Sequence, residues 1–344
     1  MRKFFPRIFG NDGTKARIGT AIAEGRLPHA LLIDGGAGSG KLTLAKSIAA
    51  ALNCENKGKE SYSLPCHDCP SCRKIFGDGH VDVRILGLDE GRATIGVGEV
   101  KELRADMFLT STEAEYKVYI IRNAERMTPA AQNALLIVLE EPPRNVVIML
   151  LASGTDKILT TIKSRAQYIP MSRFSREEIR SYLMRHDASA AIAAREDAEG
   201  FSGVLSAADG RLGRAIELIS PEMRSTLAEE REEVTSIIES LGRGGGCRDT
   251  LAAVTSLPKG RAELGESLER LMSALSDLIR QKYDEEDEPR FFGTREEAAR
   301  YAAQMTSARL FKIYDLVSEA YDKNTKNANI SMLLVALAAN MKRA

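Results

Sequence analysis

Four of the five cysteines lie within residues 54–72. They are Cys54, Cys66, Cys69 and Cys72, in the pattern Cys-x11-Cys-x2-Cys-x2-Cys. Gaps of two residues let successive thiolates turn toward one tetrahedral centre, where sulfur lies about 2.3 Å from zinc. Because four thiolates leave no open position for a catalytic water, the pattern predicts a structural zinc site.

Two alternatives to a four-cysteine zinc site are open. The same cysteines could form disulfides, although these are rare in the reducing cytoplasm, where we expect the protein to act. His67 lies inside the segment, and its imidazole could replace one thiolate. Cys247 stands apart from the group and is expected to be a free thiol.

Residues 35–41, Gly-Gly-Ala-Gly-Ser-Gly-Lys, fit the phosphate-binding pattern G-x4-G-K. The segment follows an apolar run at 30–34 and opens a helical stretch that continues to Asn53. In such a loop, backbone N–H groups and the helix N-terminus surround the phosphates, and the lysine reaches the outer ones. We therefore expect a site for ATP or ADP. Its expected binding residues are Gly35, Gly38, Gly40 and Lys41.

The loop lacks the residue that would bind Mg²⁺. A Ser or Thr is needed after Lys41, since its hydroxyl coordinates the ion, but Leu42 stands there. Thr43 comes one residue later and is turned by about 100° around the helix. We keep Thr43 among the expected binding residues, but it is a poor substitute for the missing hydroxyl.

Such a site also needs a carboxylate at the end of a neighbouring strand to organise Mg²⁺ and water. The apolar run 117–121 ends instead in Arg122-Asn123, which places a positive charge where the cation belongs. Two independent losses at one site predict that the chain does not hydrolyse nucleotide efficiently. The alternative is that Glu125, the next carboxylate, takes over the missing role.

The segments that must position these residues alternate between two types. Apolar runs of strand length lie at 30–34, 81–86, 117–121 and 146–152. Segments of helical periodicity lie between them, at 97–109 and 128–140. This alternation predicts an α/β fold, with a parallel sheet flanked by helices.

The strand signal disappears after residue 172, and the remainder has helical periodicity. Helices are expected at 176–186, at 190–219 with glycine interruptions, and throughout from 221. One apolar stripe has the spacing of a single buried helix face. It consists of Leu264, Leu268, Leu271, Leu275 and Leu278. The α/β part is therefore expected to precede a small helical domain and a helical bundle.

The composition limits the function classes. Acidic and basic side chains balance, with 48 of each. The apolar runs are far shorter than the roughly 18 residues that span a bilayer, and the sequence shows no secretory leader. We therefore expect a cytoplasmic protein without a membrane partner. Since free-standing nucleic-acid-binding proteins usually carry a basic excess, the isolated chain should bind DNA weakly.

Beyond the P-loop and the cysteine insert, five stretches resemble the AAA+ clamp-loader subunits of bacterial DNA polymerase III. They are Gly25–Ile33, Asn133–Pro143, Leu150–Ser153, Ser164-Arg165 and Gly210–Arg214. The helical remainder agrees with the family's collar by position and character only. The likeness is greatest to the delta-prime subunits. Gamma/tau subunits are similar but carry Lys-Thr or Lys-Ser in the loop and paired acids after the strand.

The resemblance implies roles for three further residues. Ser153 falls where the family has its first sensor, and Arg214 matches the second sensor in the lid domain. Arg165 matches the arginine of the family's Ser-Arg-Cys motif, although Ala166 stands where cysteine is usual. In that family the arginine reaches into the neighbouring subunit's ATP site and stabilises charge on the transferring phosphate. The alternative for Arg165 and Arg214 is an ordinary surface role.

The resemblance also implies an AAA+ core over residues 1–172 with the zinc insert at 54–72, a helical lid over 173–220, and an oligomerising collar over 221–344. The expected partners are the gamma/tau and delta subunits of a hetero-oligomer, the sliding clamp, and primed DNA within the assembly. The expected function is that of a non-hydrolysing, delta-prime-like part of the DNA polymerase III holoenzyme. It would supply Arg165 to a gamma/tau ATP site while the clamp is loaded during replication.

Two other functions compete with this interpretation. The first is an active clamp-loader ATPase of the gamma/tau type. The second is a zinc-knuckle DNA-binding module unconnected with clamps. The neutral charge and the absence of aromatic and basic clustering near Cys54–Cys72 argue against the second alternative.

Overall fold

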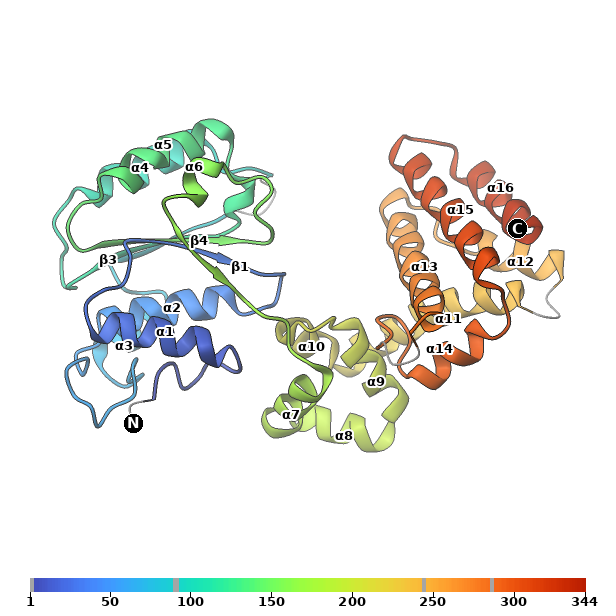
Figure 1. The fold of residues 1–344 in the computed structure, drawn as a ribbon, viewed down its shortest axis with the longest axis horizontal. Helices are drawn as coiled ribbons and strands as arrows, with labels where there is room; N and C mark the ends of the chain where they lie inside the picture. Colours follow the sequence, from blue (N-terminus) through green and yellow to red (C-terminus); the bar gives the residue numbers. More distant parts are fainter. Residues whose placement is uncertain (1–2, 89–92, 243–245, 285–287) are drawn as a thin grey trace. The chain divides into compact units, whose positions relative to one another are not determined.

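The computed structural model describes residues 3–88, 93–242, 246–284 and 288–344. The chain forms two compact units (Figure 1). The first comprises Met1–Phe174 with Arg211–Gly213, and the second comprises Ser175–Gly210 with Arg214–Ala344. Within the described residues, no helix combines the length and apolar character needed to cross a membrane.

The first unit is built on a parallel five-stranded sheet. Its strands are β1 (Ala30–Asp34), β2 (Val83–Leu86), β3 (Lys117–Ile121), β4 (Val146–Ala152) and β5 (Gln167–Pro170). They lie in the order β2-β3-β4-β1-β5. Strands β3 and β4 are buried along their whole length, because helices cover both faces of a sheet of this type.

Two groups of helices cover the two faces (Figure 1). One face carries α1 (Asp12–Ala23), α2 (Lys41–Leu52) and α3 (Pro70–Phe76); the other carries α4 (Val97–Met107), α5 (Pro129–Glu140) and the short α6 (Thr160–Lys163). Successive strand residues point to opposite faces. Leu31 and Ile33 therefore join the core beneath α2, while Leu32 joins the core beneath α4 and α5. This arrangement confirms the predicted fold class.

The strand order brings two loops together at the carboxyl edge of the sheet. β1 and β4 are neighbours, yet β1 leads into α2 on one face and β4 leads toward α6 on the other. In open parallel sheets, ligands bind where neighbouring strands connect to opposite faces. The glycine loop after Asp34 and the residue Ser153 after β4 lie at this point.

The second unit is all-helical in the residues described. Its first helices are α7 (Arg176–His186), α8 (Ala188–Glu196) and α9 (Ala198–Ala207). Helix α10 (Leu212–Leu218) follows, and it belongs to this unit from Arg214 onward. The longer segment then contains α11 (Pro221–Leu241), α12 (Cys247–Thr255), α13 (Arg261–Gln281), α14 (Arg295–Ala302), α15 (Ser307–Thr325) and α16 (Ile330–Arg343). The five leucines of the predicted stripe lie on α13, and all are fully buried. The lid and collar boundaries at 172/173 and 220/221 stay predictions.

Candidate nucleotide and metal sites

The glycine loop connects β1 to α2 and has the backbone of a phosphate cradle. Gly38 and Gly40 have φ angles of 74° and 87°, in the left-handed region that favours glycine. Helix α2 starts without a side-chain cap. The N–H groups of its first turn, which have no acceptor within the helix, are therefore available to an anion.

Lys41 extends from the start of α2 back across the loop. Its ammonium Nζ donates to the carbonyls of Gly35 and Gly36, the latter at 2.8 Å, and to Ser153 Oγ at 3.2 Å. Burial lowers the pKa of Lys41, and the negative charges of Glu125 and Asp34 oppose that effect. The structure thus brings the predicted loop lysine and the predicted sensor residue into direct contact.

A cavity of about 380 Å³ lies beside this contact. It is lined by Ala37, Gly38, Ser39, Gly40, Lys41, Leu42, Thr43, Arg122, Asn123, Leu151, Ser153 and Gly213. Gly213 donates its backbone N–H to Gly38 O at 2.9 Å, and a Cβ at Gly213 would lie 2.9 Å from that glycine's backbone. Gly213, which belongs to the first unit, therefore contacts the glycine loop at a position that fits only glycine.

The cavity does not offer Mg²⁺ its usual ligands. Among the residues described, its lining contains no Asp or Glu, whereas Mg²⁺ is usually bound through one or two carboxylates together with phosphates. Leu42 is half-buried and packs against the core instead of presenting a hydroxyl. The donor set thus agrees with the expected loss of the magnesium site.

The two carboxylates whose charges act on Lys41 are engaged in other hydrogen bonds. Glu125 Oε2 accepts the Ser153 backbone N–H at 3.3 Å, and Asp34 accepts hydrogen bonds from Gly154 N–H and Tyr168 O–H. The sequence pattern did not indicate that Asp34 holds the end of β4 in this way. Glu125, the expected substitute acid, contacts the same residue as Lys41 but does not line the cavity.

Arg165 lies in the short loop between α6 and β5. Its guanidinium forms an ion pair with Glu140, with 2.8 Å between Nη2 and Oε1. It also donates to Thr161 O at 3.1 Å and to Ser164 Oγ at 3.3 Å. The side chain is 37% exposed, so its charge remains accessible. Arg214 belongs to the second unit, where it is exposed on α10.

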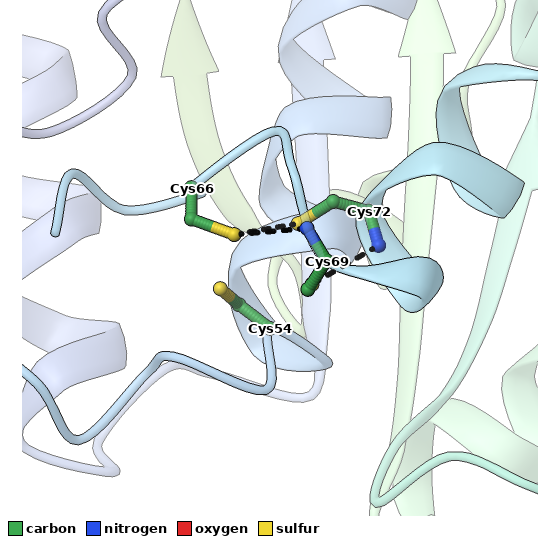
Figure 2. A group of neighbouring side chains, drawn as sticks. All are labelled: Cys54, Cys66, Cys69 and Cys72. Carbon is green, nitrogen blue, oxygen red and sulfur yellow. Dashed lines mark hydrogen bonds between the residues drawn. The ribbon is translucent and has the colours of Figure 1, made fainter.

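The four cysteines of the insert converge on one point (Figure 2). Their Sγ atoms all lie within 4.8 Å of one another, all four residues are buried, and Cys66 and Cys72 are 3.9 Å apart. Tetrahedral zinc with sulfur at about 2.3 Å would separate its ligands by about 3.8 Å. The donor set and its spacing therefore fit a zinc ion.

Backbone and side-chain N–H groups orient these sulfurs. The N–H of Cys69 donates to Cys66 Sγ at 3.4 Å, the N–H of Cys72 donates to Cys69 Sγ at 3.4 Å, and Asn56 donates to Cys66 Sγ at 3.5 Å. Such outer hydrogen bonds hold ligands in place and favour thiolates. A hydrogen bond from Cys72 lowers the pKa of Cys54 to about 5.

His67 does not join the cysteine group. Within the described residues, the potential metal-binding group consists of the four cysteines, and the His67 ring stacks on Phe76 with 4.7 Å between centroids. The insert also anchors the beginning of the chain, because Phe5 N–H donates to Leu64 O at 2.8 Å. No sequence pattern indicated that pairing. Cys247 is exposed and free, as expected.

The resemblance stated from the sequence is confirmed by comparison with known proteins. Residues 10–175 match the family described as DNA polymerase III, delta subunit. The chain is 27% identical to the DNA polymerase III subunit delta' of Bacillus subtilis over 318 residues, which cover 91% of each chain.

The gamma/tau relatives match about half of this chain. The gamma/tau subunit of Mycobacterium tuberculosis is 30% identical over 181 residues, 53% of this chain and 31% of that one. The chain thus spans about a third of the length of the first gamma/tau relatives. The structure is also similar to a solved gamma subunit-related protein of Thermotoga maritima, with a TM-score of 0.44 and 16% identity. The match includes 95% of this chain and 98% of the Thermotoga chain.

Proposed function

We propose that the chain is a non-hydrolysing, delta-prime-like subunit of a bacterial clamp loader. The observation that carries this proposal is the similarity to a delta' subunit over 91% of both chains, since it includes the helical second unit as well as the P-loop unit. In this proposal residues 173–220 form the lid, residues 221–344 form the collar, and the protein acts in the cytoplasm.

The missing magnesium ligands support the non-hydrolysing part of the proposal. Leu42 and Arg122 occupy the two positions at which a metal-dependent P-loop enzyme needs a hydroxyl and a carboxylate. The cavity lining provides no replacement acid among the described residues. Energy for the assembly would therefore come from ATP that the gamma/tau neighbours hydrolyse.

The exposed guanidinium of Arg165 supports its role as a finger. An arginine supplied to a phosphoryl-transfer site from a neighbouring protein accelerates the reaction by about 10³–10⁵-fold, because its charge stabilises the transition state. Arg165 lies on a loop of the first unit and keeps 37% of its side-chain surface exposed. We assign this role to Arg165 in a hetero-oligomer that also contains the delta subunit, the sliding clamp and primed DNA.

An active gamma/tau-type ATPase is the second candidate. Its support is the contact between Glu125 and the backbone of Ser153, 3.3 Å from Oε2 to N, which places one carboxylate near the loop lysine. A third candidate, a zinc-knuckle DNA-binding module, gains no support from the insert, because Leu64 and the four cysteines are buried in the core of the first unit.

Two measurements separate these candidates. ATP turnover by the isolated, purified chain should stay at the background level of a Lys41→Ala variant if the chain does not hydrolyse. A loader assembled from gamma/tau, delta and this chain should load the clamp on primed DNA, and omission of this chain should abolish loading. Turnover well above the variant, or loading without this chain, would contradict the proposal.

A further inference from the structure

The cavity beside the glycine loop is lined by basic side chains but lacks the carboxylates that a metal site would need. Lys41 and Arg122 both line this cavity, and no carboxylate does so among the residues described. Arg122 has no ion pair with any described acid, and its side chain is exposed. A divalent cation would meet two positive side chains here, whereas an anion would be attracted by both.

The position of Arg122 is defined by its surroundings. Its backbone N–H donates to Leu86 O at 2.8 Å on the adjacent strand β2. Its aliphatic stem passes beside Gly87, since a Cβ on that glycine would lie 3.5 Å from Arg122 Cδ. Arg122 thus follows β3 at the carboxyl edge of the sheet and lines the cavity that the loop borders, as well as a neighbouring cavity that contains Asp78.

Neutral donors in the same cavity also lack partners. The hydroxyl of Ser39 is buried without a hydrogen bond, and the residue is only 8% exposed. The first turn of α2 has no side-chain cap, so its N–H groups lack acceptors. A buried donor without a partner is costly, and a multiply charged anion would supply acceptors to the hydroxyl, the backbone and both cations together.

We infer that this cavity binds the phosphates of a nucleotide without a divalent cation, with the Arg122 guanidinium in the place that Mg²⁺ holds in active P-loop enzymes. A guanidinium provides a fixed positive charge and a planar set of donors that match phosphate oxygens in pairs. It cannot organise an attacking water as a hydrated metal does. Nucleotide would therefore be held at this loop and not consumed.

The inference deepens the proposed non-hydrolysing role at the same loop, and it is independent of Arg165. Calorimetric titration of the full chain with ATP, in EDTA and in excess MgCl₂, tests it. The affinity in EDTA should equal or exceed the affinity in MgCl₂, and inorganic tripolyphosphate should compete. Binding that requires Mg²⁺, no ATP binding in either buffer, or no competition by tripolyphosphate would overturn the inference.

Substitutions at Arg122 sharpen the test. Arg122→Ala should weaken ATP binding in EDTA at least tenfold, and Arg122→Asp should abolish it in EDTA. The matched control is Arg126→Ala, since Arg126 is exposed on the adjacent η1 (Ala124–Arg126) and does not line the cavity. Equal weakening by Arg126→Ala, or an unchanged Arg122→Ala affinity in a folded protein, would overturn the assignment to Arg122.

Failure of this inference and failure of the proposed function give different results. If ATP does not bind in EDTA but the chain still supports clamp loading without turnover of its own, the metal-free site is wrong and the subunit role stands. If ATP binds in EDTA but loading proceeds without the chain, the subunit role is wrong and the metal-free site stands.

Discussion

The guanidinium of Arg165 and the carboxylate of Glu140 form an ion pair at 2.8 Å, although both side chains remain partly exposed, at 37% and 51%. Exposed pairs of this kind contribute about 0–1 kcal/mol, because water screens them and ordering the side chains costs entropy. In the proposed finger role, Glu140 would hold Arg165 in the free chain and release it to a phosphate on a partner subunit.

This weak pairing predicts that Glu140→Ala lowers the free energy of unfolding by less than about 1 kcal/mol. Urea denaturation of the isolated chain measures the change, and Glu141→Ala on the adjoining exposed position is the control. A loss of several kcal/mol would mean that Glu140 is a structural anchor and that Arg165 is not readily released.

The cysteine geometry predicts close to one zinc per chain. Zinc content measured by atomic emission should be lost in a Cys69→Ser/Cys72→Ser double variant and kept in Cys247→Ser, because Cys247 lies outside the group. The double variant should also exchange the amide hydrogens of Phe5 and Leu64 faster, since Phe5 N–H donates to Leu64 O and Leu64 N–H donates to Lys3 O beside the site. Full zinc content in the double variant would contradict the site.

Asp82 should stabilise the first unit in a pH-dependent way. Burial disfavours its charge, but the backbone N–H groups of Glu113, Thr112 and Ala114 donate to the carboxylate and hold its pKa below the usual range. The stabilisation is therefore complete above the unfolded pKa of about 3.9 and is lost as the pH falls through the lower folded value.

Asp82→Ala should lower the free energy of unfolding by about 3 kcal/mol at pH 7, because it leaves buried donors without an acceptor. The difference between wild type and variant should shrink on acidification below pH 4. Denaturant unfolding at several pH values measures it, with the exposed Asp156→Ala as the control. A difference that does not change with pH would contradict the role of the charge.

We predict opposite effects on stability for alanine substitutions at two glycines, Gly213 and Gly13. A Cβ at Gly213 would clash with the backbone of Gly38, so Gly213→Ala should lower the melting temperature and weaken ATP binding. A Cβ at Gly13 on α1 meets no atom within 4 Å, and Gly→Ala in a helix stabilises by about 1 kcal/mol. Equal melting temperatures and equal ATP affinities for the two variants would contradict the close contact between Gly213 and Gly38.

The apolar runs predicted four of the five strands, including the edge strand β2, but they missed the other edge strand, β5. β1, β3 and β4 lie in continuous apolar runs because both faces are covered. β5 is short, and three of its four residues are exposed, so no apolar run marks it. The stretch at 190–219, for which the sequence predicts helices interrupted by glycines, contains α8, α9 and α10. The break between the first two lies at Asp197, which caps α9.

The site was predictable where spacing determines geometry. The cysteine pattern and the loop pattern each lie within a short segment, so their residue types indicated a cluster. No sequence pattern marks the contacts between residues that come from different strands of the sheet. The bonds of Ser153 to Lys41 and Glu125, and the place of Gly213 against Gly38, depend on strand order. Only the family resemblance pointed to Ser153.

The role of Arg165 is the central claim, and ATP turnover by a reconstituted loader tests it most directly. Arg165→Ala is compared with Arg17→Ala, an exposed arginine on α1 at the opposite face of the sheet. Subunit assembly is verified by size-exclusion chromatography. We predict that Arg165→Ala assembles normally but has clamp-stimulated turnover and clamp loading at least tenfold below the Arg17→Ala loader. Equal turnover by the two intact complexes would contradict the account.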